Sequence, residues 1–399
     1  MSVPPRPNPF RSSRAFRRLW IARTVSQVGD GIAVVALVLL VQGTQRTGVA
    51  VGTLLLASSL PRFLGPFAGA VADRVEQRAL MVGCDLGSAV VFLVIAAFEP
   101  SFAWLLVLVA ASAVLDTLFA PAGRSAIPAL VESEDLLRAN AWMGTSLNLR
   151  VAVGTLLGGA LVAGLGARGA LAANACSFLL SAALLTGLPR LRAPRQGERR
   201  GLFAVGTEGL AYAWRTPAVR PLVVALFLGV AFAAVDNVAL VFLVRETLGG
   251  GPLAFGVVSA AYGVGMMAAS IGLSWRQTTV AAGALLLAGW SASGAGTLLT
   301  GLAPLLAVAA VAQAVAGFGN GMENVAGDTL IQQVVPREML GRVFGLAATA
   351  AFGGSTLAYA TGGFVLDLTS ARTVLLIAGT GVLAVTAFLW ASLRRAGRR

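Results

Sequence analysis

Residues 69–78 read Gly-Ala-Val-Ala-Asp-Arg-Val-Glu-Gln-Arg, a charged segment set between two apolar runs. The run before it begins near Gly48, and the run after it begins near Ala79. Each is roughly 20 residues long, which is the length of a helix that crosses a bilayer. Charges that follow such a run mark the point where the chain leaves the hydrocarbon. The segment therefore predicts two membrane helices joined by a short polar loop.

Apolar runs continue along the whole chain. It has 399 residues, of which 57% are hydrophobic and only 12% charged, whereas soluble domains average about 25% charged residues. Runs broken by Gly, Pro or charge predict an all-α membrane protein with twelve transmembrane helices in two six-helix bundles. These helices are predicted to begin near Phe16, Gly48, Ala79, Phe102, Arg138, Ala167, Pro217, Pro252, Thr278, Pro304, Arg342 and Ala371.

The basic residues orient these helices. All 30 of them are Arg, and with the N-terminus inside, four fall on the outer side: Arg46, Arg168, Arg245 and Arg372. Arg23 and Arg150 fall within predicted helices, and all the others fall on the inner side. This positive-inside bias predicts a multi-pass protein of the bacterial cytoplasmic membrane with both termini in the cytoplasm. It also explains the net charge of +13 without a nucleic-acid partner.

The longest polar interruption divides the predicted helices six and six. It predicts an N-terminal bundle over residues 1–188, a cytoplasmic linker over 189–216 and a C-terminal bundle over 217–399. The halves also resemble each other, because the nine residues from Asp30 align with the nine from Asp236 and share Asp, Ala, Val, Leu and Val. Transporters built from such repeats bind their substrates at the repeat interface.

Several polar side chains fall inside these apolar helices. A charged side chain at the bilayer centre costs at least about 2.5–3.5 kcal/mol, so such residues usually face a cavity or a partner. We expect seven to line a cavity for substrate and protons: Asp30, Asp236, Glu323, Arg23, Arg150, Gln27 and Asn237. The two arginines either bind an anionic substrate group or neutralise a neighbouring acid, and the sequence leaves both alternatives open.

Asp30 is the first candidate for a proton carrier, because the chain contains no His. A carboxyl group that alternates between two solvent-accessible sides can take up a proton on one side and release it on the other. Asp236 shares this task or binds a positive charge on the substrate, and Glu323 is the next candidate. The alternative is that Asp30 is only structural, with Gly29 and Gly31 marking a kink.

The pattern GxxxDRxxxR after the second predicted helix resembles the signature loop of the major facilitator superfamily. Residues 16–33, 121–131 and 340–346 resemble its bacterial branch of macrolide and siderophore exporters. The resemblance covers essentially the whole chain. It implies that the loop latches the inner side of the membrane in one transport state, whereas a simple positive-inside turn is the alternative.

The resemblance also implies the members of this gate: Gly69, Asp73, Arg74, Arg78, Asp116 and Arg342. Gly69 would admit a neighbouring helix. Asp73 would lie at the N-terminal end of the helix that starts near Arg342, where the helix dipole favours an anion. The eighth loop position, usually Gly in the family, is Glu76.

Together these features predict a secondary active transporter that exports an amphiphilic small molecule, such as a drug, an antibiotic or a siderophore-like metabolite, in exchange for protons. Uptake, or lysophospholipid transport on the same fold, is the alternative. ATP is not the expected energy source, because a Walker A motif needs a Lys and the chain has none. We expect no enzyme activity, no cofactor and no metal site. The expected partners are substrate, protons and lipid, and the expected state is a monomer.

Overall fold

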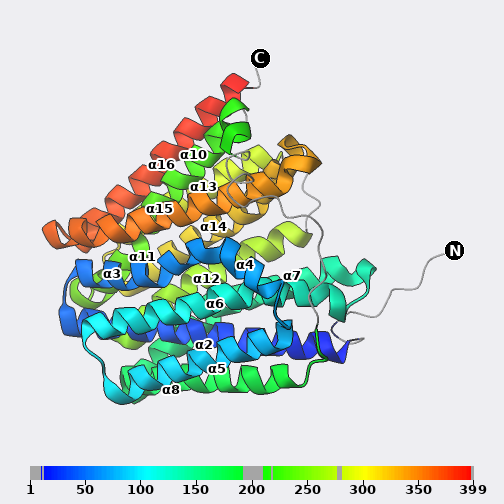
Figure 1. Ribbon diagram of the computed structural model, residues 1–399. Coiled ribbons are helices and arrows are strands. Elements are labelled where there is room, and N and C mark those ends of the chain that lie inside the picture. The colour runs from blue at the N-terminus through cyan, green and yellow to red at the C-terminus, as the bar shows by residue number, and fades with distance from the viewer. Residues whose placement is uncertain (1–9, 11–12, 192–209, 217–218, 276–280, 397–399) are drawn as a thin grey trace. The chain divides into compact units, whose positions relative to one another are not determined.

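The computed structural model describes residues 10, 13–191, 210–216, 219–275 and 281–396, and these residues form helices without any strand (Figure 1). Most of the predicted linker, residues 192–209, lies outside this range, as do the predicted helix starts at Pro217 and Thr278. The N-terminal helices are α2 (Arg14–Gln45), α3 (Gly48–Ser59), η1 (Leu60–Leu64), α4 (Gly65–Ala72), α5 (Gln77–Phe98), α6 (Phe102–Leu130), η2 (Ser133–Asp135), α7 (Leu136–Leu149), η3 (Arg150–Gly154) and α8 (Thr155–Thr186). The C-terminal helices are α10 (Val219–Ala233), α11 (Asp236–Phe242), η4 (Leu243–Thr247), α12 (Pro252–Trp275), α13 (Ala282–Leu302), α14 (Leu306–Val334), η5 (Arg337–Met339), α15 (Leu340–Leu368) and α16 (Ala371–Ala396).

Nine helices in the described part of the chain are long and apolar enough to cross a membrane. The longest candidate, Arg138–Thr186, is interrupted at Gly166, whose backbone is not helical (φ 71°, ψ 175°). Gly48–Leu64 is apolar but shorter. The helix starts agree well with the sequence, since Phe102, Pro252 and Ala371 open α6, α12 and α16.

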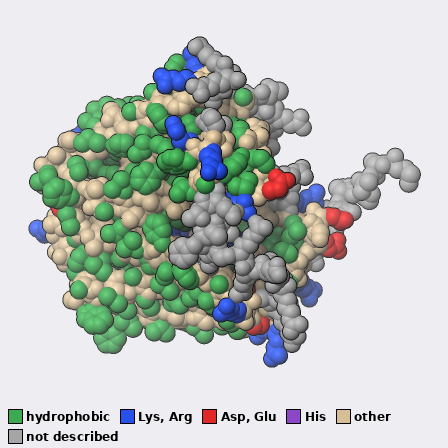
Figure 2. Space-filling view, turned by 45° about the horizontal axis from the view of Figure 1, so that its top comes forward, with side chains coloured by type: hydrophobic (Ala, Val, Ile, Leu, Met, Phe, Trp, Pro, Cys, Tyr) green, Lys and Arg blue, Asp and Glu red, His purple; other side chains and the backbone are tan. Residues whose placement is uncertain are grey.

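The molecular surface is strongly apolar, and hydrophobic side chains cover much of the face shown in Figure 2. Large side chains are exposed at positions where a soluble protein would place polar residues. Phe98 is 77% exposed, Leu368 68% and Trp104 65%. Exposure of this extent requires an apolar surrounding, and a lipid bilayer provides it.

Contacts divide the chain into two units, Met1–Leu37 with Pro61–Gly197, and Val38–Leu60 with Glu198–Arg399. The segment Val38–Leu60, which the sequence analysis placed in the first bundle, thus groups with the second unit. The predicted domain boundaries stay a prediction.

Segment Val38–Leu60 joins the second unit through the start of α3, which lies against the end of α15. The carboxylate of Asp367 accepts hydrogen bonds from the backbone N–H groups of Gly48 and Val49, the latter at 3.0 Å. A Cβ atom at Gly363 would lie 2.3 Å from the carbonyl oxygen of Gly48, so only glycine fits there. The acid at the helix N-terminus and the close backbone approach together hold α3 on α15.

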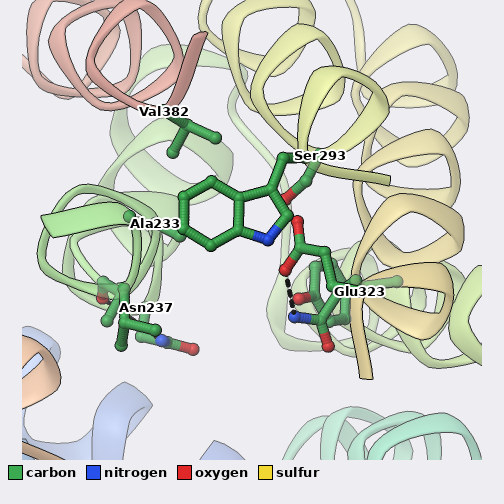
Figure 3. Close-up of a pocket in the computed structure, with 11 residues that line it drawn as sticks. Ala233, Asn237, Ser293, Glu323 and Val382 are labelled. Atoms are coloured by element: carbon green, nitrogen blue, oxygen red, sulfur yellow. Dashed lines mark hydrogen bonds between the residues drawn. The ribbon is translucent and has the colours of Figure 1, made fainter. Parts of the chain in front are cut away.

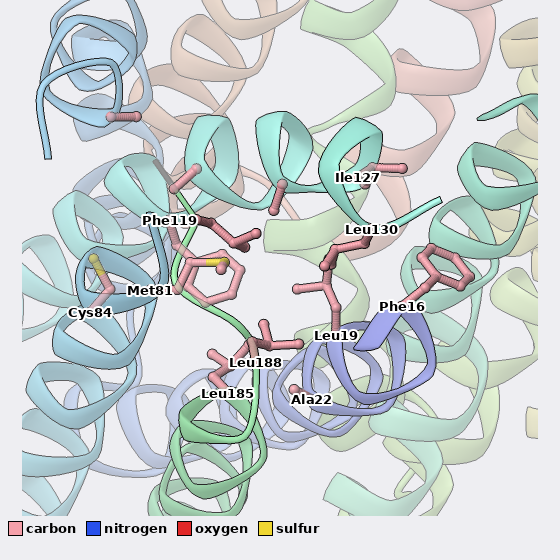
Figure 4. Close-up of a cluster of buried hydrophobic side chains, with 14 of the residues drawn as sticks. Phe16, Leu19, Ala22, Met81, Cys84, Phe119, Ile127, Leu130, Leu185 and Leu188 are labelled. Atoms are coloured by element: carbon pink, nitrogen blue, oxygen red, sulfur yellow. The ribbon is translucent and has the colours of Figure 1, made fainter. Parts of the chain in front are cut away.

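The first unit has a hydrophobic core of its own. Phe16 and Leu19 of α2 meet Met81 of α5, Phe119 of α6 and Leu185 of α8 in one buried cluster (Figure 4). Helices α5 and α8 run side by side in this unit (Figure 1). This core fixes the helices on which the charged residues of the unit lie.

The signature loop is fixed to the first unit by Glu76, which caps the N-terminus of α5. One carboxylate oxygen accepts from the N–H of Ala79 at 2.8 Å, and the other accepts from the N–H of Leu191 at 2.9 Å. Gln77 returns a backbone bond to the carbonyl of Leu191 at 3.0 Å. Burial opposes ionisation of Glu76, but these N–H donors, together with Arg78, outweigh it and hold the pKa of Glu76 below its ordinary value.

Replacing Glu76 by Ala should lower the free energy of unfolding by about 1–2 kcal/mol, because a helix cap is lost. The free energy of unfolding of Glu76→Gln should lie between those of the wild type and Glu76→Ala, since the amide has only one acceptor oxygen. The lowered pKa means that the charge stabilises the folded state at neutral pH and that this contribution is lost as the pH falls through the folded-state pKa. Thermal unfolding in detergent, compared between neutral and acidic pH, should show the wild type and Glu76→Gln converging in acid. A difference that does not change with pH would contradict this role.

Candidate functional site

The first unit holds a cluster of charged side chains on its membrane helices. Its members are Arg23 and Asp30 on α2, Arg62 on η1, Asp85 on α5, Asp116 on α6 and Arg150 on η3. Three guanidinium groups and three carboxyl groups have formal charges that cancel. Such compensation is what makes charges tolerable inside a membrane protein.

Arg23 and Asp116 form the direct ion pair of this cluster. Both terminal nitrogens of the guanidinium lie 3.3 Å from Oδ1 of Asp116, and the guanidinium carbon lies 4.7 Å from the centre of the Phe119 ring. Asp116 lies half-way along α6 and is paired with Arg23 of α2. Its predicted role at the inner gate stays a prediction.

Gln27 lies between the two arginines that the sequence placed in the cavity. Its amide oxygen accepts from Arg150 at 3.5 Å, and with the amide group turned it accepts from Arg23 at 2.8 Å. Arg150 opens a π-helical turn, a geometry that is frequent at functional sites. A Cβ atom at Gly31 would lie 2.3 Å from the carbonyl oxygen of Arg150. Gly31 therefore allows this turn to lie directly against α2, which is one helix from Arg14 to Gln45.

Asp30 lies among charged side chains from five elements. Arg150, Asp116, Arg23 and Arg62 act on it electrostatically, and Asp30 also acts on Asp85 of α5. Arg62 was not recognised from the sequence and was counted with the inner arginines. It lies in a 3₁₀-helical segment inside the second predicted span, and the pair Pro61-Arg62 within an apolar run was the signal.

Asp85 is the most buried acid of the cluster. It is 2% exposed, and its Oδ2 has no hydrogen-bond partner among the described residues. Arg23, Asp30 and Asp116 are its charged neighbours. These neighbours place Asp85 within the charged cluster.

In the second unit, Asp236 is hydrogen-bonded to a neutral amide group. Asp236 begins α11 where the seventh predicted span is interrupted after α10. The amide of Gln313 on α14 donates to both of its carboxylate oxygens, at 3.0 and 3.1 Å. Gln313 is 1% exposed and was not singled out from the sequence, although a Gln in the apolar run of α14 was visible there.

Glu323 lines a separate pocket of about 160 Å³ within the second unit. The amide of Asn320 donates to Glu323 at 3.2 Å. Ser293 and Glu323 lie on one side of the pocket, and Ala233 and Asn237 lie on the other (Figure 3). Asp236 is not among the lining residues, so the structure does not bring Asp236 and Glu323 together in this pocket.

Two predicted gate residues, Arg78 and Gly69, differ in their surroundings in the first unit. Arg78 donates to the carbonyl of Leu188 at 2.8 Å, just after the end of α8. Gly69 was expected to admit a helix, yet among the described residues no atom lies within 4 Å of the position that a Cβ atom would take there. The expected approach of a helix at Gly69 stays a prediction.

The other gate residues lie at helix ends. Asp73 caps the C-terminus of α4, and Arg74 follows it with a backbone bond to Val71. Arg342 lies in the first turn of α15, and its guanidinium contacts the sulfur of Met339 at 2.9 Å. Their roles as a latch stay a prediction. Over the described ranges, no group of three or more His, Cys, Asp or Glu side chains is placed to hold a metal ion.

Comparison with known proteins identifies the group to which this architecture belongs. A family model described as transmembrane secretion effector, within the major facilitator superfamily (MFS), matches residues 7–397. The chain belongs to this family. MFS proteins are transporters and not enzymes, so the chain is a multi-pass membrane transport protein, as the sequence predicted.

The relatives are similar over most of their length. The chain is 26% identical over 390 residues to the uncharacterised MFS-type transporter YfiS of Bacillus subtilis, covering 93% of this chain and 91% of YfiS. It is also 26% identical over 351 residues to the enterobactin exporter EntS of Citrobacter koseri, covering 84% of this chain and 82% of EntS. These matches confirm the resemblance to the exporter branch at modest identity.

Solved structures support the fold. A bacterial homologue of the human lysosomal transporter Spinster has a TM-score of 0.72 at 16% identity and covers 98% of both chains. The nucleoside transporter NupG has a TM-score of 0.72 at 13% identity, and the match covers 95% of this chain and 99% of NupG. At such identities the likeness shows the fold alone.

Removing one partner of the Arg23–Asp116 pair should destabilise the protein by stranding the other charge. Arg23→Met should cost about 1–3 kcal/mol, below the roughly 3–5 kcal/mol of a fully buried pair, because the Asp116 side chain is 36% exposed. The double variant Arg23→Met/Asp116→Leu should recover much of this loss. A double-mutant cycle on unfolding in detergent measures the coupling. Strictly additive effects of the two substitutions would show that the ion pair does not stabilise the fold.

Proposed function

We propose that the protein is a proton-coupled exporter of an amphiphilic small molecule, which works by alternating access. In this proposal twelve helices form two six-helix bundles, residues 1–188 and 217–399, joined by a cytoplasmic linker. The chain acts as a monomer in the bacterial cytoplasmic membrane with both termini inside. The strong excess of inner arginines supports this orientation.

The charged cluster of the first unit is the observation that carries the proposal. Its formal charges cancel while all three acids are ionised, so protonation of Asp30 leaves an excess positive charge among Arg23, Arg62 and Arg150. An uncompensated charge in a poorly hydrated site is costly, and a rearrangement that hydrates or re-pairs it is favoured.

Two members of the cluster lie on backbone that departs from the regular α-helix. Arg62 is on a 3₁₀-helical segment and Arg150 on a π-helical turn, rather than on regular α-helix. Loss of the Asp30 charge weakens the attraction that both arginines exert on α2. The proton thereby changes the relative stability of two arrangements of these segments, which is what coupling requires.

Export, rather than uptake, is supported by the enterobactin exporters among the relatives. Enterobactin is a siderophore, and the present chain shares only 26% identity with these exporters. The proposed substrate class is therefore the broader one of amphiphilic metabolites and drugs. An antiport mechanism further predicts that the protein confers resistance to toxic members of this class.

Asp30→Asn should abolish pH-gradient-driven transport while leaving the protein folded and able to bind its substrate. Its carboxamide keeps the size of the side chain but carries no exchangeable acid proton. The measurement is proton movement in proteoliposomes on addition of a substrate, chosen by thermal shift from a panel of amphiphilic cations and siderophores. Glu132→Gln, an acid in the loop after α6, serves as the matched control.

Wild-type proton flux per substrate in Asp30→Asn would remove Asp30 from the mechanism and make Asp236 or Glu323 the next carrier to test. If the wild type moves substrate only down its concentration gradient, and no pH gradient reverses that movement, the result would instead support the alternative of uptake or lipid transport.

The proposed latch gives a second prediction. Asp73→Asn and Arg74→Ala should each remove most transport while the protein still inserts and folds, because charge-assisted contacts that hold one transport state are lost. Transport is measured in the same proteoliposomes, with thermal unfolding as the folding control. Normal transport by both variants would leave the loop as a simple topological turn.

A further inference from the structure

The pocket of the second unit has a chemistry different from that of the charged cluster in the first. Helices α10 to α14 and α16 surround it. Its polar and aromatic lining residues are Asn237, Tyr262, Trp290, Ser293, Asn320 and Glu323. Glu323 is the only acidic residue among those that line it, and none of them is basic. The lining therefore favours a single positive charge.

Hydrogen-bonding side chains hold the carboxylate of Glu323 toward the pocket. Asn324 donates to the amide oxygen of Asn320, and the Asn320 amide donates in turn to Oε2 of Glu323, each at 3.2 Å. Ser293, from α13, faces the same carboxylate (Figure 3). The acid is thus oriented by neighbours on two helices, and no guanidinium neutralises it within the pocket lining.

Aromatic rings complete the lining. Trp290 of α13 is 4% exposed, and its six-membered ring rests on Gly229 of α10. A Cβ atom at Gly229 would lie 2.4 Å from two carbons of this ring, so the glycine makes room for the indole. Tyr262 of α12 supplies a second ring. An aromatic face beside a carboxylate is the combination that recognises alkylated ammonium groups.

The size of the pocket limits what it can hold. Its volume of about 160 Å³ is below the roughly 300–1,000 Å³ of sites that enclose whole drug-sized ligands. It suits a compact head group of a few heavy atoms, with the remainder of an amphiphile lying outside.

We propose that this pocket is a subsite for the alkylated ammonium head group of a cationic substrate, with Glu323 as its counter-ion and Trp290 as its aromatic wall. The proposal names a substrate class for the exporter and rests on that proposed function. It sets this chain apart from a transporter that recognises its substrate only through guanidinium groups.

Equilibrium binding tests the subsite without requiring transport. Choline and 3,3-dimethylbutan-1-ol have the same shape, and only choline is charged. Radiolabelled choline should bind the purified full-length protein saturably, and the neutral alcohol should compete at least tenfold less well than unlabelled choline. Glu323→Gln should weaken choline binding at least tenfold, and Trp290→Leu should do so while Trp290→Phe retains most of the affinity.

Control variants are available within the chain. Glu99→Gln and Trp104→Leu change the same residue types at exposed positions outside the pocket and should leave choline binding unchanged. Gly229→Ala is a second test that keeps Glu323, because it should displace the Trp290 ring and weaken binding. Thermal unfolding confirms that each variant is folded. Absence of saturable choline binding by the wild type would overturn the subsite. Choline binding by Glu323→Gln and Gly229→Ala with the affinity of the wild type would also overturn it.

Failure of the subsite and failure of the exporter give different results. If choline does not bind but a pH gradient still drives export of another substrate, the subsite is wrong and the proposed function stands. If choline binds as described but no substrate moves with protons in proteoliposomes, the proton-coupled mechanism is wrong.

Discussion

The cost of placing charge in a medium that solvates it poorly is the constraint on which the first unit depends. Six ionisable side chains on its membrane helices are tolerated because their charges compensate one another. Within this cluster Arg23 and Asp116 form the direct ion pair, and Asp85 keeps an oxygen without a hydrogen bond among the described residues. The compensation is thus collective, and changing the charge of one member changes the energy of all of them.

Close backbone contacts make this arrangement possible. Gly31 brings the carbonyl of Arg150 against α2, and the π-helical turn that begins at Arg150 carries its guanidinium toward Gln27. In the second unit a glycine again allows close packing, because the absence of a side chain at Gly229 leaves room for the ring of Trp290 beside the pocket. Small residues therefore decide where the polar groups of both units lie.

The sequence predicted the helices well because hydropathy is a local property, and starts such as Phe102 and Pro252 were read directly from it. It also singled out Arg23, Gln27 and Arg150, which the structure brings together. It missed Arg62, because a 3₁₀-helical segment cannot be recognised from hydropathy. It missed the role of Gln313, whose partner lies on a helix distant in the chain.

Two further partners could not be read from the sequence for the same reason. Hydropathy could not reveal the partner of Asp116, because Arg23 lies on another helix far away in the chain. Glu76 looked like a departure from the family pattern, yet it caps α5 and holds the end of the first unit. Both residues needed a partner from elsewhere in the chain before their roles were clear.

Infrared difference spectroscopy of the reconstituted protein tests proton exchange at Asp30, because it observes the protonated carboxyl groups themselves. We expect a carboxylic-acid band that changes when the pH is stepped across the range used to drive transport, and that is absent in Asp30→Asn. The same band should persist in Glu132→Gln, which lies outside the cluster. A pH-dependent carboxyl band of undiminished size in Asp30→Asn would contradict the claim that the charged cluster exchanges its proton at Asp30.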